Sequence, residues 1–324
     1  MKNRLKKENR YQSNEKIIVE PHNTIWSRTF DEEAEKIKKA LGDNCIEIHH
    51  IGSTSIPNLA AKPIIDILPV VKDIMKVDVC NKQMEELGYE ARGELGMLFR
   101  RFFRKRGFNV HVFEEDSPEI ERHLLFRAYL SENPDARNEY GALKISLAEK
   151  WVTDKFEYTI GKNDFITSLI KKSGFEGMVI VHALHRSEWE EYHRIREEQI
   201  FIPIGVKYDR NHPTISDLNH VHLVMYKSSV IVGMAHIEFR SNSCCILRGI
   251  AIDKQLQRQG IGTSLLQLLE KWLRQKNIKV LYLHTDKNKI EFYTRLGYTR
   301  MDFEDNDALM IKNRIELGKI LENK

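Results

Sequence analysis

The chain has 324 residues, of which 41% are hydrophobic and 30% charged, and its formal net charge is +4. This is the composition of a soluble globular protein of about two ordinary domains. Basic and acidic residues are mixed along the sequence, which argues against a dedicated nucleic-acid surface. No apolar run is long enough to span a bilayer, and none follows the basic N-terminus. We therefore expect no signal peptide, no membrane partner and a cytoplasmic location.

The four cysteines, Cys45, Cys80, Cys244 and Cys245, form no C-x-x-C pair. The sequence therefore predicts neither a zinc site nor a thioredoxin-type redox motif. We expect all four to be reduced thiols, as in most cytosolic proteins.

The first half of the chain begins with a polar arm that extends to about residue 14. Apolar residues at helical spacing then predict a helix over 30–41, which Gly42 ends. Two apolar strands are predicted at 46–51 and 64–68, with the turn 52–55 between them. Residues 118–172 carry helical apolar faces, and 171–174 form the predicted linker to the second half.

The order of these elements is that of nucleotidyltransferase folds, which have a strand, a Gly-Ser turn, a short helix and then a strand that carries an acid. In those folds the turn holds a phosphate and the acids hold Mg²⁺. The amino-acid sequence of this half resembles one family of nucleotidyltransferase-like proteins, the GrpB family. The segments that carry the resemblance are 50–57, 60–67, 87–89, 101–103, 110–113, 125–127 and 140–144. The resemblance covers roughly 15–172 and implies a nucleotidyltransferase-like mixed-sheet domain over 15–174.

The GrpB resemblance also implies an anion site for a nucleotide or another phosphorylated ligand. Taken singly, each Lys or Arg of this half is better explained as a solvated surface charge. As a set tied to the family pattern, the residues expected at the site are Gly52, Ser53, Thr54, Ser55, Lys62, Asp66, Arg101, Arg127 and Lys144. His111 faces either this site or the structural interior.

Two departures from the family pattern bear on catalysis. Leu68 stands two residues after Asp66, where active enzymes carry a second metal-binding acid, and Ala128 replaces another acid. Asp66 alone is a weak Mg²⁺ site, because Mg²⁺ takes carboxylates together with substrate oxygens. Three alternatives stay open: a ligand-binding domain, an active Mg²⁺-dependent nucleotidyltransferase, and a non-catalytic scaffold or regulatory module. Leu68 favours the first and the third.

The second half predicts a mixed α/β sheet domain over 177–324. Strands are expected at 178–183, 221–226, 230–239, 245–252 and 280–283, with closing strands near 297–303 and 308–311. Helices are expected at 188–199, 261–273 and 288–296. A last helix is predicted to place Ile315, Ile320 and Leu321 on one side.

The turn Gln257–Gly262 joins the buried strand 245–252 to the amphipathic helix that follows it. Glycine lets backbone N–H groups close on an anion. The start of the helix adds free N–H groups and the positive end of the helix dipole. We therefore predict a phosphate site at this turn, suited to a pyrophosphate.

Gln/Arg-x-x-Gly-x-Gly before a helix resembles the acetyl-CoA loop of the Gcn5-related N-acetyltransferases, the GNAT family. Asn288 and the segment 292–298 add to the resemblance, although Glu291 stands where a small residue is common. The resemblance implies acetyl-CoA as cofactor and a primary amine of a small molecule or peptide as acceptor, chosen by the loop 201–216. The cofactor-binding residues that it implies are Ile250, Ala251, Ile252, Gln257, Arg258, Gln259, Gly260, Ile261, Gly262, Thr263, Asn288 and Tyr293.

Direct acetyl transfer needs a base for the acceptor ammonium and an acid for the leaving thiolate. Tyr293 matches the thiolate-protonating tyrosine of the GNAT family. Candidates for the base are His236 and Glu238, which share a strand face because they are two residues apart, and His284 near the next strand. A water chain is the alternative to all three.

Overall fold

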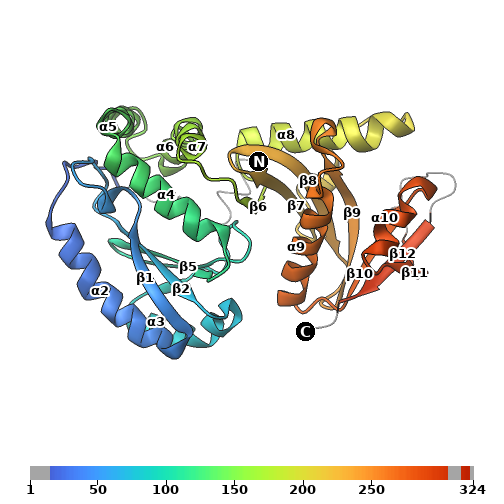
Figure 1. The fold of residues 1–324 in the computed structure, drawn as a ribbon, viewed down its shortest axis with the longest axis horizontal. Helices are drawn as coiled ribbons and strands as arrows, with labels where there is room; N and C mark the ends of the chain where they lie inside the picture. The colour runs from blue at the N-terminus through green and yellow to red at the C-terminus, as the bar shows by residue number, and fades with distance from the viewer. Residues whose placement is uncertain (1–14, 306–314, 322–324) are drawn as a thin grey trace. The chain divides into compact units, whose positions relative to one another are not determined.

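The computed structural model describes residues 15–305 and 315–321 (Figure 1). The chain forms two compact units that divide between Val179 and Ile180, with the short turn 227–229 grouped with the first unit. Each unit contains one mixed sheet with helices beside it, so the predicted α/β class is confirmed. The predicted N-terminal arm and the predicted strand at 308–311 lie outside the described residues.

The first unit has a five-stranded sheet in the order β1-β2-β5-β4-β3. Its strands are β1 (Cys45–Ile51), β2 (Ile65–Val71), β3 (Glu90–Ala91), β4 (Arg101–Lys105) and β5 (Phe108–Glu114). β2 pairs antiparallel with β1 and parallel with β5. The turn that follows β1 contains the short 3-10 helix Ser53–Ser55 and leads back toward β2.

Helices cover both faces of this sheet, which explains the nearly continuous apolar run of β2. The helices are α2 (Ile25–Leu41), α3 (Asn81–Glu86), α4 (Pro118–Glu132), α5 (Pro134–Lys150), α6 (Lys155–Ile160) and α7 (Asn163–Lys172). On one face, Ile37 and Leu41 of α2 join Ile67 of β2 in an apolar cluster. On the other face, Leu124 of α4 packs against a cluster that contains Leu68.

The second unit has a seven-stranded sheet in the order β11-β12-β10-β9-β8-β7-β6. Its strands are β6 (Met178–His182), β7 (His220–Lys227), β8 (Val230–Phe239), β9 (Cys244–Ile252), β10 (Val280–Thr285), β11 (Thr299–Arg300) and β12 (Ile315–Ile320). Its helices are α8 (Arg186–Arg196), α9 (Ile261–Gln275) and α10 (Ile290–Arg295). The pair β9–β10 is parallel, whereas β8–β9 and β10–β12 are antiparallel.

The helices α8 and α9 lie on opposite faces of this sheet. Met234 of β8 clusters with Trp189 and Tyr192 of α8. Phe239 of the same strand contacts Trp272 of α9 edge-on, with ring centroids 5.9 Å apart. Positions 234 and 239 differ by an odd number, so their side chains point to opposite faces.

The sheet is interrupted beside β9. The pairing of β9 with β10 ends at Leu247 and Leu283, and β9 continues to Ile252 with no strand of the described residues paired on that side. At the same place the β8–β9 register skips Arg248, because Gly249 opposes His236 and Leu247 opposes Ile237. Arg248 is therefore the extra residue of a β-bulge, which bends its strand and re-aims a side chain.

One predicted element is wrong. Residues 315–320 form the strand β12 rather than a terminal helix, and Leu317 is buried opposite Leu283. The helical prediction used the spacing of Ile315, Ile320 and Leu321 alone. It overlooked the buried Leu317, which follows Ile315 at the two-residue spacing of a strand. Gly318 also fits a close contact, because an added Cβ would meet the side chains of Met301 and Tyr282.

Cysteines and membrane spans were also predicted from the sequence. All four cysteines are free thiols; Cys245 is buried and the others are half-buried. Among residues 15–305 and 315–321, no helix combines the length and the apolar character needed to cross a bilayer.

The boundary between the two units is open to test with two separately expressed fragments. Phe175 is 1% exposed, and Gly177 lies against both the Phe175 ring and Pro118. We therefore place Phe175 in the first unit and predict that residues 1–177 and 178–324 each unfold cooperatively. In the fragment 1–177, Phe175→Ala should lower the free energy of unfolding by about 3–5 kcal/mol, the usual cost of a buried Phe→Ala change.

Denaturant unfolding of the two fragments measures both effects. The matched control is Val79→Ala, because Val79 is 76% exposed and should change stability little. If neither fragment is cooperative while the whole chain is, the proposed boundary is wrong.

Candidate active site and anion-binding residues

The loop before α9 exposes backbone N–H groups. Arg258 and Gly260 have φ angles of 61° and 80°, so the backbone adopts the left-handed conformation at two positions of one turn. The first helical bond of α9 runs from the Ser264 N–H to the Gly260 carbonyl, at 3.0 Å. The N–H groups of residues 261–263 therefore have no partner inside the helix and are available to an anion.

The two glycines of this loop differ in what the fold requires of them. Gly260 is the N-cap of α9, and its positive φ disfavours any other residue. Gly262 has no such angle, and a Cβ added there would meet Ile252 and Phe292 at ordinary contact distances of 3.6 and 3.9 Å. The folded protein therefore tolerates a small side chain at position 262.

Side chains fix the loop to the rest of the second unit. The Gln257 amide donates to the carbonyl of Ile252 and to the side chain of Gln199, each at 3.0 Å. Arg194 of α8 pairs with Asp253 at 2.5 Å. α8, the end of β9 and the loop are therefore held together, which restricts the position of the exposed N–H groups.

Tyr293 is buried on α10 and lies edge-on to the rings of Phe292 and Tyr298. Burial raises the pKa of its phenol well above the usual range, and the charge of Asp286 adds to this effect. The phenol is therefore neutral at physiological pH, which is the form that can donate a proton. Asn288 is exposed in the turn just before α10, and its N–H bonds to Asp286 at 2.9 Å.

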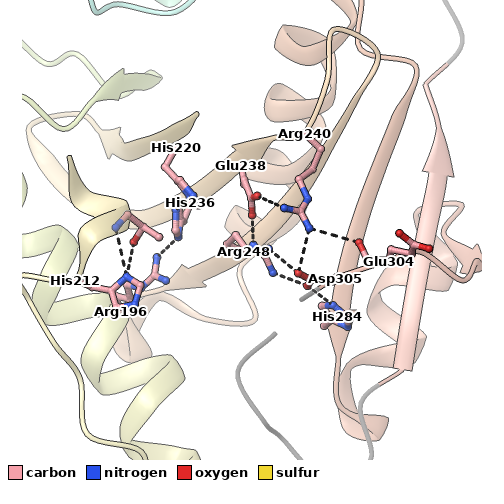
Figure 2. Close-up of polar contacts among 11 residues, drawn as sticks. Arg196, His212, His220, His236, Glu238, Arg240, Arg248, His284, Glu304 and Asp305 are labelled. Atoms are coloured by element: carbon pink, nitrogen blue, oxygen red, sulfur yellow. Dashed lines mark hydrogen bonds and ion pairs between the residues drawn. The ribbon is translucent and has the colours of Figure 1, made fainter. Parts of the chain in front are cut away.

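A band of polar side chains lies on the face of the sheet that α8 covers, and it contains the three predicted bases (Figure 2). One part of the band surrounds Arg248. Its guanidinium donates to Glu238 at 2.5 Å and to both oxygens of Asp305 at 2.5 and 2.7 Å. Arg240 donates to the other oxygen of Glu238 at 2.9 Å. His284 completes this part, since its Nε2 lies 2.7 Å from Asp305.

The other part of the band surrounds Arg196 of α8. Its Nη1 donates to Nδ1 of His236 and to the hydroxyl of Tyr192, both at 2.7 Å. Tyr192 in turn lies 2.7 Å from Nδ1 of His222, whose Nε2 is 2.9 Å from the Thr214 carbonyl. A carbonyl can only accept, so Nε2 of His222 carries a proton; in the neutral ring Nδ1 then accepts from the Tyr192 hydroxyl.

The same reasoning fixes the proton on His236. An arginine has no acceptor, so Nδ1 of His236 carries no proton. Its Nε2 lies 2.8 Å from Nδ1 of His220, to which the neutral ring donates. Burial holds the pKa of His236 well below its usual range, and Arg196 and the neighbouring histidines lower it further.

The three predicted bases thus differ in their free atoms. Both carboxylate oxygens of Glu238 and both ring nitrogens of His236 already have partners. His284 uses Nε2 for Asp305, and its Nδ1 is buried without a hydrogen-bond partner among the described residues. If Asp305 accepts from Nε2, the Nδ1 atom carries the lone pair that a base needs.

The Gly-Ser turn of the first unit lies against Asp66 on β2. Gly52 has a φ of 71°, and a Cβ there would collide with the Asp66 carboxylate. Thr54 and Ser55 hold the turn itself: Thr54 donates to the Ile64 carbonyl at 3.3 Å, and Ser55 donates to the Gly52 carbonyl at 2.7 Å.

Asp66 already has protein partners. Its Oδ1 accepts from Asn109 at 2.9 Å and lies 3.5 Å from Nε2 of His111. Burial by itself would raise the pKa of Asp66, but His111, Asn109 and Lys62 outweigh it and hold that pKa below its usual value. Within 15–305 and 315–321, no group of three or more His, Cys, Asp or Glu residues is arranged to hold a metal ion.

The predicted cations of the first unit do not all lie together. Arg101 is buried and engaged by Asp78, with bonds of 2.6 and 2.8 Å, so its guanidinium is not directed to an anion site. Arg127 donates to the His50 carbonyl at 2.6 Å, beside the Gly-Ser turn. Lys62 and Lys144 interact electrostatically with each other.

Comparison with known proteins agrees with this division of the chain. The family described as GrpB protein matches residues 16–172, and the acetyltransferase (GNAT) family matches residues 180–298. The UPF0157 protein BH1888 of Halalkalibacterium halodurans is 34% identical over 163 residues, which are 49% of this chain and 84% of that protein. The chain belongs to the GrpB family over its first half and to the GNAT family over its second.

Two further relatives match the GrpB half. The UPF0157 protein YqkA of Bacillus subtilis is 45% identical over 155 residues, which are 47% of this chain and only 45% of YqkA. A crystal structure of the conserved protein GrpB from Enterococcus faecalis is 43% identical, covers 48% of this chain and 96% of that chain, and has a TM-score of 0.47. We refer below to the two matched regions as the GrpB domain and the GNAT domain.

Sequence reasoning missed several residues that the structure groups with the predicted ones. In the GrpB domain these are Lys162, Tyr140 and Tyr158. In the GNAT domain they are Arg248 and Asp305, whose ion pair joins the strand bulge to His284. The acid-rich segment after 302 gave no periodic signal that would have singled out Asp305.

We predict that removing the Arg248 guanidinium strongly lowers the free energy of unfolding of the GNAT domain. Arg248→Met removes the closer of the two guanidinium groups that bridge Glu238 and Asp305, and both carboxylates are buried. We expect the GNAT domain to lose about 3–5 kcal/mol of stability, as when one partner of a buried ion pair is deleted.

Thermal and denaturant unfolding of the full chain measure this loss. Arg240→Met is the matched control, because the Arg240 side chain is 34% exposed against 11% for Arg248. The control should lose about 1 kcal/mol or less. Equal losses in the two variants would contradict the central role of Arg248.

Proposed function

We propose that the GNAT domain transfers an acetyl group from acetyl-CoA to a primary amine of a small molecule or peptide. The observation that carries the proposal is the loop 257–263. Exposed N–H groups, a left-handed turn and the start of a fifteen-residue helix come together there, beside the part of β9 that is no longer paired with β10. The family match agrees with this assignment.

Backbone groups account for cofactor binding in this proposal. The pyrophosphate binds to N–H groups of the loop and of residues 261–263, where the helix dipole favours negative charge. The pantetheine arm lies along Ile250–Ile252, where β9 has no pairing with β10. Gln257, Gln259 and Asn288 flank the path, and no side-chain cation is required apart from Arg258.

Proton transfer is assigned to Tyr293 and His284. Tyr293 is neutral and buried, so it protonates the leaving thiolate. His284 is the predicted base that retains a free ring nitrogen, and Asp305 orients its ring and stabilises the imidazolium that forms. Glu238 and His236 then position Arg248 and Arg196 on the acceptor face instead of removing protons.

For the GrpB domain we propose an anion-binding role without nucleotidyl transfer. Asp66 is engaged by Asn109 and His111, and Leu68 is fully buried in the core, so the strand offers a metal no second ligand. The alternative of an active Mg²⁺-dependent half therefore has no support from the described geometry.

Cofactor binding is tested at Gly262. Gly262→Asp introduces a carboxylate next to the proposed pyrophosphate, and we expect it to weaken acetyl-CoA binding by at least ~3 kcal/mol. Gly262→Ala, which the fold accommodates, should weaken binding less. Isothermal titration calorimetry measures the two affinities.

Gln267→Asp is the matched control for Gly262→Asp. It adds the same charge to α9 at an exposed position, and acetyl-CoA affinity should hold. Undiminished binding by Gly262→Asp would exclude the loop as the pyrophosphate site, and absence of binding by the wild-type chain would exclude the acetyltransferase proposal.

The proton-transfer roles are tested by turnover. Tyr293→Phe keeps the ring and removes the hydroxyl, so kcat should fall about 10²-fold while acetyl-CoA affinity holds. His284→Gln should lower kcat by a similar factor for the same reason. Thiol release with a panel of amines, next to calorimetry, separates turnover from binding.

Tyr298→Phe is the control for Tyr293→Phe. Tyr298 bonds to the buried Glu270 at 3.0 Å, so its loss should reduce stability and leave turnover nearly unchanged. Normal turnover in Tyr293→Phe or His284→Gln would remove the acid or the base role from that residue, and would leave the fold assignment intact.

A further inference from the structure

Three lysines of the GrpB domain meet around two tyrosine rings. Lys62 precedes β2, Lys144 lies on α5, and Lys162 precedes α7. The ammonium groups of Lys62 and Lys162 lie 4.9 and 4.6 Å from the ring centroid of Tyr158. The ammonium group of Lys144 lies 4.6 Å from the ring centroid of Tyr140. We call these five residues the lysine cluster.

The cluster lacks counter-ions. Lys144 is only 2% exposed, and its Nζ has no hydrogen-bond partner in the described part of the chain. No carboxylate of residues 15–305 or 315–321 comes within ion-pair distance, 4 Å, of any of the three lysines. Asp66 is the acid that acts on Lys62 and Lys162 from farther away, and it already accepts from Asn109.

Such an arrangement is unfavourable in a protein without a ligand. An unpaired buried ammonium loses its hydration and gains little in exchange. Burial lowers the pKa of Lys144 to about 7, and the charges of Lys162 and Lys62 add to this effect. Burial and Lys62 likewise lower the pKa of Lys162 to about 7. An anion between the lysines would supply the missing partner for all three.

We propose that the lysine cluster binds an anion with at least two negative charges, of the class of phosphate and diphosphate groups. Three lysines face one distant carboxylate, so a dianion leaves the cluster close to neutral. Lys62, Lys162 and Ser53 are half-buried, which gives the anion access from solvent. This assignment rests on the anion-binding role proposed for the GrpB domain and names its site.

The chemistry of the cluster selects the anion and disfavours a metal. The Ser53 side chain interacts with the Tyr140 phenol, whose ring faces the Lys144 ammonium, so hydroxyl groups accompany the lysines. Hydroxyl and ammonium groups donate to phosphate oxygens. The three lysines would repel a divalent cation. The one carboxylate of β2, Asp66, is already engaged by Asn109 and His111 and so does not favour a metal either.

Binding should depend on pH with a defined sign. The charged or titratable groups that act on the three lysines are Asp66, Tyr140, Tyr158, Arg104 and Lys155, together with the lysines themselves. Below pH 7 the lysines are charged before the anion arrives. Above pH 7, Lys144 and Lys162 must take up protons on binding, so affinity falls by up to about tenfold per pH unit for each lysine.

The test uses the full chain and two inorganic probes. Pyrophosphate serves for affinity at pH 7, measured by calorimetry and by the shift in Tm. Sulfate serves for the pH profile, because its own charge does not change over the range. Wild type should be stabilised by pyrophosphate, take up protons on binding, and bind sulfate more weakly as pH rises above 7.

Lys144→Met is the decisive variant. It keeps the length of the side chain and removes the unpaired charge, so the free protein should have an equal or higher Tm. Pyrophosphate affinity should fall about tenfold or more, the value of one charge-assisted contact. Lys150→Met, on the exposed side of the same helix, should leave both quantities unchanged.

The possible outcomes separate the site from the proposed role. If pyrophosphate binds Lys144→Met as tightly as wild type, or sulfate affinity is flat with pH, the lysine cluster is not the site. If no anion binds wild type, the anion-binding role of the GrpB domain is wrong as well. Release of pyrophosphate from ATP and Mg²⁺ by wild type, lost in Asp66→Asn, would overturn the binding-only role.

Discussion

The need to compensate buried charge organises both domains of this protein. Glu270 of α9 is 3% exposed, and it accepts from Lys319 at 2.7 Å and from Tyr298 at 3.0 Å. In the GrpB domain the buried Glu33 accepts from Tyr89, Lys36 and Lys105. These contacts join elements far apart in sequence, because a carboxylate removed from water is tolerated only where several donors converge on it. They therefore specify the packing of helices on sheets more sharply than apolar contacts alone.

The lysine cluster of the GrpB domain departs from this rule. Lys144 is as deeply buried as Glu270, yet its ammonium group has no hydrogen-bond partner among the described residues and lies over the face of the Tyr140 ring. A ring face offsets part of the lost hydration of a cation, and gives it no hydrogen-bond acceptor. Methionine at position 144 would remove this unpaired charge and so raise the stability of the protein without ligand. The retention of lysine there is best understood as a requirement of binding, which a ligand with acceptor oxygens satisfies.

The sequence was sufficient to predict the two domains, the glycine loop and the strand-to-helix turn, because these depend on local patterns. Glycine spacing and apolar periodicity are properties of neighbouring residues. The partners of charged residues are not: Arg101 was expected at the anion site, but Asp78, 23 positions earlier, engages it. Lys162 was missed because nothing in its local sequence shows that its ammonium group lies against the Tyr158 ring and acts on Lys144. The predicted terminal helix was wrong for a related reason, since β12 forms a strand where β10 and β11, both distant from it in the local pattern, offer it partners.

Arg248 shows how one local irregularity serves both structure and chemistry in the GNAT domain. As the extra residue of the bulge, it lies where β9 separates from β10. The bulge turns its side chain toward Glu238 of β8 and toward Asp305, and Asp305 in turn orients His284 of β10. The ion pairs bridge the strands where main-chain hydrogen bonds are missing. The gap where we propose that the cofactor binds can therefore remain open without loss of rigidity, and the same guanidinium fixes the carboxylate on which the proposed base depends.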